Sequence, residues 1–148
     1  MKNKMRMLGI DYGEARVGIA ITDALNITVQ GLETIQRNGS DKVVLKRLDE
    51  ILAKYEVETI VVGMPFHMNG DISQRAEVTN AFIHKLKCKY NKINIETIDE
   101  RLTTVEAHKT MNFLDINKNK KRNIVDTISA VYILETYLNK YKNSLQNN

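Results

Sequence analysis

The sequence predicts an α/β fold in which helices cover both faces of a mixed five-stranded sheet, with strands in the order 3-2-1-4-5 and strand 2 antiparallel. Three β-like segments in a row, joined by short links, predict an antiparallel meander at the N-terminus. Two helical patterns then alternate with two further strands, as in right-handed parallel crossover units. Because a meander can be extended in a parallel sense only beside its first strand, strand 1 becomes the central strand.

The first two strands form a hairpin over residues 7–23, MLGIDYGEARVGIAITD. Two apolar runs are separated by about five residues that include Gly13, which is typical of a hairpin. Residues 27–35 alternate and carry β-branched side chains, and they predict the third strand, with Gly31 as a bend or bulge. Asp11 therefore lies at the exit of the central strand.

Two helices and two strands follow the meander. Residues 41–55 have the helical period, with Ser40 or Asp41 as the N-cap. Residues 57–63, VETIVVG, predict a buried strand that Pro65 ends. Residues 73–90 repeat the helical pattern, and residues 93–98 predict the fifth strand. The predicted buried faces of the two helices are Val44, Leu48, Ile51, Leu52 and Tyr55, and then Val78, Phe82, Leu86 and Tyr90.

The last third of the chain predicts two more helices. Thr103 and Glu106 have capping-box spacing for a helix over residues 104–113. An Asn/Lys-rich loop over residues 117–123 then leads to a long helix that starts at Asn123. Its predicted apolar face is Ile128, Val131, Leu134, Leu138 and Tyr141. We expect a single domain over residues 1–142 and a polar tail over residues 143–148.

Positive charge is concentrated near the C-terminus. Residues 1–108 hold 15 Lys/Arg and 15 Asp/Glu, whereas residues 109–148 hold 7 and 3, so the net charge of +4 lies in the last quarter. Such an excess is typical of a surface that binds a polyanion, although a solvated loop would have the same composition. Most of the excess comes from one basic cluster, Lys118, Lys120, Lys121 and Arg122.

Several function classes are disfavoured by composition. The basic N-terminus has no signal-peptide core or membrane span, because Asp11 interrupts its apolar run, so we expect a cytoplasmic protein without a membrane partner. The single cysteine, Cys88, cannot form an internal disulfide. The three histidines are not spaced as metal-ligand pairs.

Acidic residues recur at one edge of the predicted sheet. Asp11 ends the central strand, Asp99 and Glu100 end the fifth, and the turn at residues 63–65 lies between them. Like charges that meet in this way raise one another's pKa unless a cation intervenes. Oxygen ligands without His or Cys favour Mg²⁺ or Mn²⁺ over Zn²⁺. A simpler alternative for Asp11 is that it accepts hydrogen bonds from the turn amides of Gly13 and Glu14.

A further carboxylate, Asp126, lies near the predicted start of the last helix. A structural explanation is available, because an acidic first turn complements the helix dipole and Asp126 could close a cap with Asn123. The functional explanation is that a basic loop and Asp126 would arrive together at the candidate site.

Three motifs in order resemble the YqgF/RuvX family. These proteins are Holliday-junction-resolvase-like members of the ribonuclease-H-like superfamily, also described as pre-16S ribosomal RNA nucleases. The motifs are GIDYG at residues 9–13 with RVG at 16–18, VGMP at 62–65 with NG at 69–70, and DERLTTVEA at 99–107. Val125-Asp126 and Ser129-Ala130 complete the match, with Ser129 where alanine is common. The resemblance covers nearly the whole chain.

The resemblance implies a ribonuclease-H-like fold and a catalytic, metal-binding acid set of Asp11, Glu100 and Asp126. Asp99 stays an alternative to Glu100, because the strand pattern does not say which of the two faces the site. Two Mg²⁺ or Mn²⁺ ions would support phosphodiester hydrolysis that leaves a 5′-phosphate and a 3′-hydroxyl. The residues expected to hold phosphates without reading bases are Arg16, Arg101, Lys118, Lys120, Lys121 and Arg122.

Other functions stay open at this point. The implied role is 5′-end processing of pre-16S ribosomal RNA, and the alternative substrate is a four-way DNA junction. A non-catalytic nucleic-acid-binding protein could keep the same fold. The GIDYG motif also resembles the first phosphate motif of actin-like ATPases and sugar kinases, but those need two such domains. Without an extra apolar stripe we expect a monomer or a weak homodimer.

Overall fold

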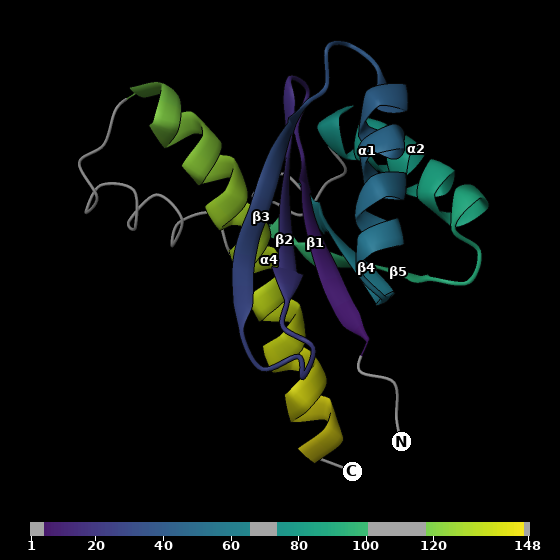
Figure 1. Ribbon diagram of the computed structural model, residues 1–148, viewed down its shortest axis with the longest axis vertical. Helices are drawn as coiled ribbons and strands as arrows, with labels where there is room; N and C mark the ends of the chain where they lie inside the picture. The colour runs from purple at the N-terminus through teal and green to yellow at the C-terminus, as the bar shows by residue number, and fades with distance from the viewer. Residues whose placement is uncertain (1–4, 66–73, 101–117, 147–148) are drawn as a thin grey trace.

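The fold is built on one five-stranded sheet, shown in the computed structural model of Figure 1, which describes residues 5–65, 74–100 and 118–146. The strands are β1 (Arg6–Tyr12), β2 (Arg16–Thr22), β3 (Val29–Gln36), β4 (Val57–Met64) and β5 (Asn94–Asp99). The helices are α1 (Asp41–Lys54), α2 (Gln74–Lys89) and α4 (Lys118–Gln146). The expected helix over residues 104–113 lies outside the described residues.

The strand order is β3-β2-β1-β4-β5, which confirms the order predicted from connectivity. β1 and β3 both run antiparallel to β2, whereas β4 pairs parallel to β1 and β5 pairs parallel to β4. The carboxyl ends of β1, β4 and β5 therefore meet at one edge, which we call the carboxyl edge and which lies at the top of Figure 1.

The two faces of the sheet alternate along β1, as the two-residue period of a strand requires. Leu8 and Ile10 belong to the apolar cluster under α1 and α2. Met7 belongs to the cluster under α4, and Gly9 lies directly against α4. We call these two sides the α1/α2 face and the α4 face (Figure 1). Helices thus cover both faces, as predicted.

The α1/α2 face holds the larger core. Ser40 caps α1 by accepting from the Lys42 amide, and Val44, Leu48 and Ile51 are buried as predicted. In α2 the prediction was partly wrong, because Val78 is 48% exposed and the buried face includes Thr79 and Ile83. Ala76 and Thr79 are small enough to pack closely against the sheet, which turns this side of α2 inward. The buried residues of α2 are Ala76, Thr79, Phe82, Ile83 and Leu86.

α4 begins at Lys118, five residues before the predicted start, so the predicted loop over residues 117–123 was wrong from Lys118 onward. Lys, Arg and Asn carry only small helix penalties, and no Gly or Pro interrupts the segment. Asn123 is consequently inside the helix and is not its cap, and Asp126 is not in the first turn. The helix continues to Gln146, into the segment expected to be a polar tail.

α4 approaches the sheet most closely where strands carry glycine. A Cβ added to Gly9 would lie 2.7 Å from the Ala130 carbonyl oxygen, and one added to Gly63 would lie 2.5 Å from Ile133 Cδ1. The inward face was predicted only in part. Leu134 and Leu138 are buried as predicted, but Tyr141 is 46% exposed and Ala130 and Ile133 are completely buried. Because glycine in the strands lets the helix backbone approach the sheet, the inward face of α4 includes an alanine. The predicted face contained only large apolar residues and therefore left this alanine out.

Candidate functional site at the carboxyl edge

Asp11 lies on the α4 face, two residues after Gly9 and near the carboxyl end of β1. It is paired across the hairpin with Gly18, and its side of the sheet is the side that α4 covers. Of the two turn amides suggested as donors to Asp11, that of Gly13 donates instead to the Arg16 carbonyl oxygen at 2.9 Å. Alternation along β2 places Arg16 on the same face and edge as Asp11.

Glu100 directly follows β5 and lies on the α4 face as well. A Cβ added to Gly63 would lie 2.8 Å from Glu100 Oε1 and 2.8 Å from its Cγ, next to Ile133 of α4. Ile98 packs in the α4 core, so alternation turns Asp99 toward the α1/α2 face. The pairing of β1 with β4 ends at Ile10 and Val62. Gly63 follows there, so Asp11 and Glu100 lie on its two sides.

Arg75, in the first turn of α2, joins the ends of β1 and β5. Its Nη2 donates to the Tyr12 carbonyl oxygen at 3.3 Å, and its Nη1 lies 3.9 Å from Glu100 Oε2. The Arg75 side chain is 56% exposed while that of Glu100 is 13% exposed. This residue was not predicted from the sequence. No sequence pattern identifies it, because the contact depends on how α2 lies above the sheet edge.

A hydrogen-bonded cluster fixes the other side of the same edge. The Asp41 carboxylate accepts from Tyr12 Oη at 2.5 Å, from Arg37 Nε at 2.8 Å and from Lys85 Nζ at 2.8 Å. Burial alone would raise the pKa of Asp41, but the hydrogen bonds from Lys85, Tyr12 and Arg37 outweigh it and hold that pKa below its usual value. Burial, together with the bond to Asp41, raises the pKa of Tyr12 to about 12. This cluster ties β1 to α1 and α2.

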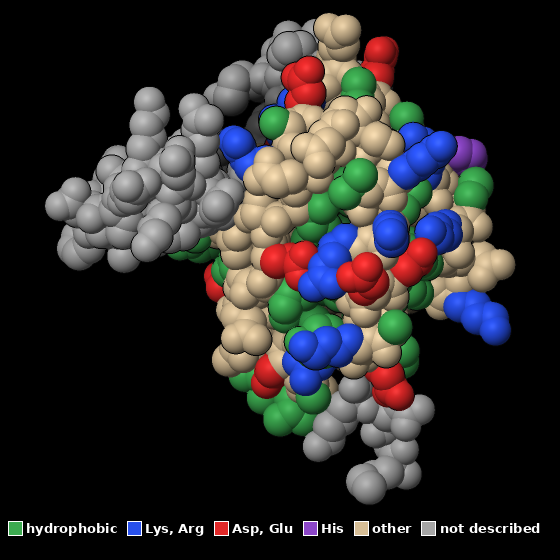
Figure 2. All heavy atoms as spheres, turned by 45° about the horizontal axis from the view of Figure 1, so that its top comes forward, with side chains coloured by type: hydrophobic (Ala, Val, Ile, Leu, Met, Phe, Trp, Pro, Cys, Tyr) green, Lys and Arg blue, Asp and Glu red, His purple; other side chains and the backbone are tan. Residues whose placement is uncertain are grey.

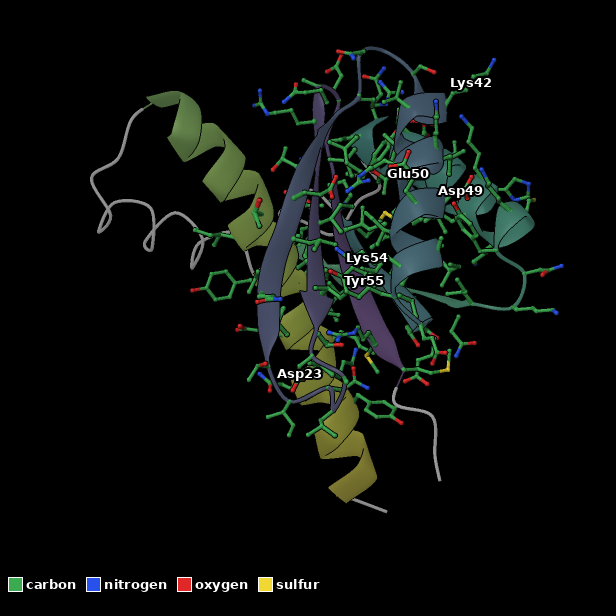
Figure 3. The ribbon with its side chains drawn as sticks, viewed as in Figure 1. Asp23, Lys42, Asp49, Glu50, Lys54 and Tyr55 are labelled. Atoms are coloured by element: carbon green, nitrogen blue, oxygen red, sulfur yellow. The ribbon has the colours of Figure 1, made fainter. Side chains whose placement is uncertain are left out.

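Charged groups elsewhere serve the scaffold. Figure 3 shows Asp23 in the β2–β3 loop at the opposite edge of the sheet, where its carboxylate accepts from the Ile27 and Thr28 amides. Those backbone hydrogen bonds lower the pKa of Asp23. Tyr55, at the far end of α1, lies under the cations of Arg6 and Lys54. In Figure 2, Lys and Arg are interspersed with acidic side chains over the face in view.

Of the remaining predicted site residues, the structure describes only the backbone of those in α4. Arg101 lies outside the described residues, and α4 contains Asp126 and the basic cluster (Lys118, Lys120, Lys121 and Arg122), whose side chains also lie outside them. Within residues 5–65, 74–100 and the described side chains of α4, no group of three or more Asp, Glu, His or Cys residues could hold a metal ion. No helix in the same part of the chain is long and apolar enough to cross a membrane.

Comparison with known sequences points to one family. A family model described as "RuvX: Holliday junction resolvase" matches residues 5–140. A protein of Ruminiclostridium cellulolyticum is 51% identical over 136 residues, which cover 92% of this chain and 95% of that protein. A protein of Acetivibrio thermocellus is 48% identical, covering 90% and 95% of the two chains. Both carry the name "Putative pre-16S rRNA nuclease".

Solved structures show the same arrangement of strands and helices. Thermus thermophilus RuvC in complex with a Holliday junction substrate matches with a TM-score of 0.57 and 12% identity, over 93% of this chain and 96% of that one. A second RuvC structure from Thermus thermophilus matches with a TM-score of 0.54 and 10% identity. This likeness confirms the ribonuclease-H-like fold class.

Proposed function

Because the chain belongs to the RuvX family, we propose that it is a divalent-metal-dependent nuclease that hydrolyses phosphodiester bonds in 5′-end processing of pre-16S ribosomal RNA. The observation that carries the proposal is the position of Asp11 and Glu100 at one edge and on one face of the sheet, on the two sides of Gly63. Carboxylates that share one edge and one face of a sheet repel one another, and a divalent cation bound between them would offset that repulsion.

Asp126 is the proposed third acid, and its place in α4 supports that role. The helix runs from the carboxyl edge toward the opposite edge (Figure 1), and Ala130 touches the sheet at Gly9. Asp126 precedes Ala130 by about one helical turn, and Asp11 follows Gly9 by two strand residues. One helical turn and two strand residues each span about 5–7 Å, and both segments run toward the carboxyl edge. This spacing supports a position for residue 126 near Asp11.

The donor set fits a hard divalent cation, since all of its proposed members are carboxylates. Gly63 supports this fit, because any larger residue there would intrude on the Glu100 carboxylate. Asp11, Glu100 and Asp126 would hold two Mg²⁺ or Mn²⁺ ions, which when bound supply an activated water and stabilise charge on the leaving oxygen.

The chain's own residues would bind and orient the substrate. Arg16 shares the face and edge of Asp11, so it would hold a phosphate of the strand at the acids. Arg101 and the basic cluster would bind further phosphates. Because phosphate contacts carry no sequence information, affinity should fall steeply with salt and depend little on base sequence. Arg75 would hold Glu100 and the end of β1 in their relative positions.

Two other functions are kept for specific reasons. The family description favours a four-way DNA junction as the alternative substrate. A resolvase must cut two strands symmetrically, which favours a two-fold dimer, whereas RNA processing has no such need. We expect a cytoplasmic protein that is a monomer or a weak homodimer. A non-catalytic nucleic-acid-binding protein would bind either substrate and cut neither.

The test is parallel cleavage of precursor 16S RNA and of a four-way DNA junction, each with Mg²⁺ and with chelator. We expect Mg²⁺-dependent cleavage of the RNA that Asp11→Asn abolishes. Asp23→Asn makes the same substitution at the opposite edge and should leave cleavage intact. Preferential junction cleavage would select the alternative substrate. Binding without cleavage of either substrate would favour the non-catalytic function, and cleavage retained by Asp11→Asn would refute the site.

A further inference from the structure

A cleft of about 480 Å³ opens at the carboxyl edge on the α1/α2 face, on the opposite side of the edge from Asp11. Its walls come from the β1–β2 hairpin, from the residue that directly follows β3, and from the first two turns of α2. Arg75 belongs both to this cleft and to the ion pair with Glu100. The lining includes Tyr12, Glu14, Arg37, Arg75, Val78 and Thr79, and we call the cleft the Arg37/Arg75 cleft.

Two guanidinium groups and one carboxylate, that of Glu14, line this cleft. Arg37 also pairs with Asp41, and Arg75 pairs with Glu100 at the longer distance of 3.9 Å. Arg37 is held in place, because Nε donates to Asp41 Oδ1 at 2.8 Å and to Tyr12 Oη at 3.1 Å, and Nη1 donates to the Glu14 carbonyl oxygen at 3.2 Å. A guanidinium has five N–H donors, more than these contacts need. A fixed arginine loses little further entropy on binding, so this arrangement suits a phosphate.

The rest of the lining fits a sugar–phosphate chain better than a small free anion. Val78 contributes an apolar side chain that is 48% exposed. Thr79 is buried and donates its hydroxyl to the Arg75 carbonyl oxygen within α2, so it adds a further apolar contribution through its methyl group. An apolar wall beside two cations offers contact to a ribose or deoxyribose and charge to the phosphate attached to it.

We propose that the Arg37/Arg75 cleft binds a backbone phosphate of the substrate strand beyond the carboxylate site, with the adjoining sugar against Val78. The proposal rests on the proposed function as a nuclease, and it adds a contact on the α1/α2 face. A strand that crosses the carboxyl edge passes Arg75, which connects the two sites through Glu100 and the Tyr12 carbonyl. The cleft thereby sets the path of the strand on one side of the cleavage point.

The experiment measures binding in chelator, so that no cleavage is involved. The affinity of a 12-nucleotide single strand, as DNA and as RNA, is followed by fluorescence anisotropy from 0.1 to 1 M salt. For a single strand, the slope of log affinity against log salt concentration falls by about 0.7 for each phosphate contact removed. This corresponds to about fivefold weaker binding at 0.1 M salt. We expect this loss for Arg37→Gln and for Arg75→Gln. Arg47→Gln is the matched control, because Arg47 lies on α1 and pairs with Glu33 and Glu50.

A second measurement separates phosphate binding from a structural effect. Each phosphate of the DNA strand is replaced in turn by an uncharged methylphosphonate. Wild-type protein should lose about fivefold at one or two adjacent positions, and Arg37→Gln should show no further loss there. Arg37→Lys, which keeps the charge and guards against misfolding, should restore most of the salt slope.

The proposal is overturned by any of three results. One is wild-type affinity in both arginine variants. Another is weaker binding by the arginine variants when no single methylphosphonate position weakens binding by wild type. The third is a wild-type protein that binds neither strand. The nuclease proposal fails separately, through cleavage that Asp11→Asn does not reduce, and either result can occur without the other.

Discussion

Replacing Gly63 by alanine should damage catalysis more than stability. The new Cβ would lie 2.8 Å from Glu100 Oε1, whereas ordinary van der Waals contact begins at 3.4 Å, so the carboxylate oxygen must retreat by about 0.6 Å. A misplacement of about 1 Å in a catalytic site can lower the rate roughly 100-fold. We therefore expect Gly63→Ala to reduce kcat/KM by about 10- to 100-fold.

The stability cost of Gly63→Ala should be small by comparison. The other close neighbour is Ile133 Cδ1 at 2.5 Å, which is the end of a flexible side chain. Overpacking of this kind costs about 1–3 kcal/mol, and we expect the lower end of that range. The assay pairs Mg²⁺-dependent cleavage of a labelled oligonucleotide with urea unfolding. Undiminished kcat/KM in a folded Gly63→Ala protein would refute the assignment of Glu100 to the site.

Three further predictions test separate parts of the structure. Gly9→Ala should lower the free energy of unfolding by about 1–3 kcal/mol, because its Cβ meets the rigid Ala130 carbonyl at 2.7 Å; urea unfolding that matches wild type would contradict the close packing of α4. Asp41→Asn should cost about 1–3 kcal/mol at pH 7, because Lys85 and Arg37 lose a charged acceptor. The folded pKa of Asp41 lies below its usual 3.8, so its stabilisation is complete well above pH 4 and is lost as pH falls through the folded pKa. Lowering the pH below 4 should therefore lower the Tm of wild type more than that of Asp41→Asn. Parallel curves of Tm against pH for the two proteins would argue against the cluster. Changing the basic cluster to Gln, which preserves helix propensity, should lower the salt slope of single-strand binding by up to about 3, and an unchanged slope would discard its role. That cluster is Lys118, Lys120, Lys121 and Arg122.

Strand order could be predicted from the chain because connectivity leaves few choices. Once residues 7–35 form a meander, a parallel strand has only one side of β1 on which to pair, and the observed order follows. The same reasoning brought Asp11 and Glu100 to one edge. It could not separate Glu100 from Asp99, because that distinction depends on which face Ile98 takes in β5, and this is a property of the register with β4.

Helix boundaries and cross-element contacts were harder to predict. The start of α4 was missed because polarity was taken as a sign of a loop, although Lys118 and its neighbours are compatible with a helix. The inward face of α2 was displaced because Thr79 is buried in place of a larger apolar residue. Arg75 carries no local signal at all, since its role comes from the distance between α2 and the end of β5.

The most direct test of the carboxylate site is a titration of Mn²⁺ into the full-length protein, followed by electron paramagnetic resonance of the free ion. We predict saturable binding by wild type that is greatly weakened in Asp11→Asn and in Glu100→Gln but unchanged in Asp23→Asn. Equal Mn²⁺ binding by all four proteins, or none by wild type, would contradict the claim that these acids form one metal site.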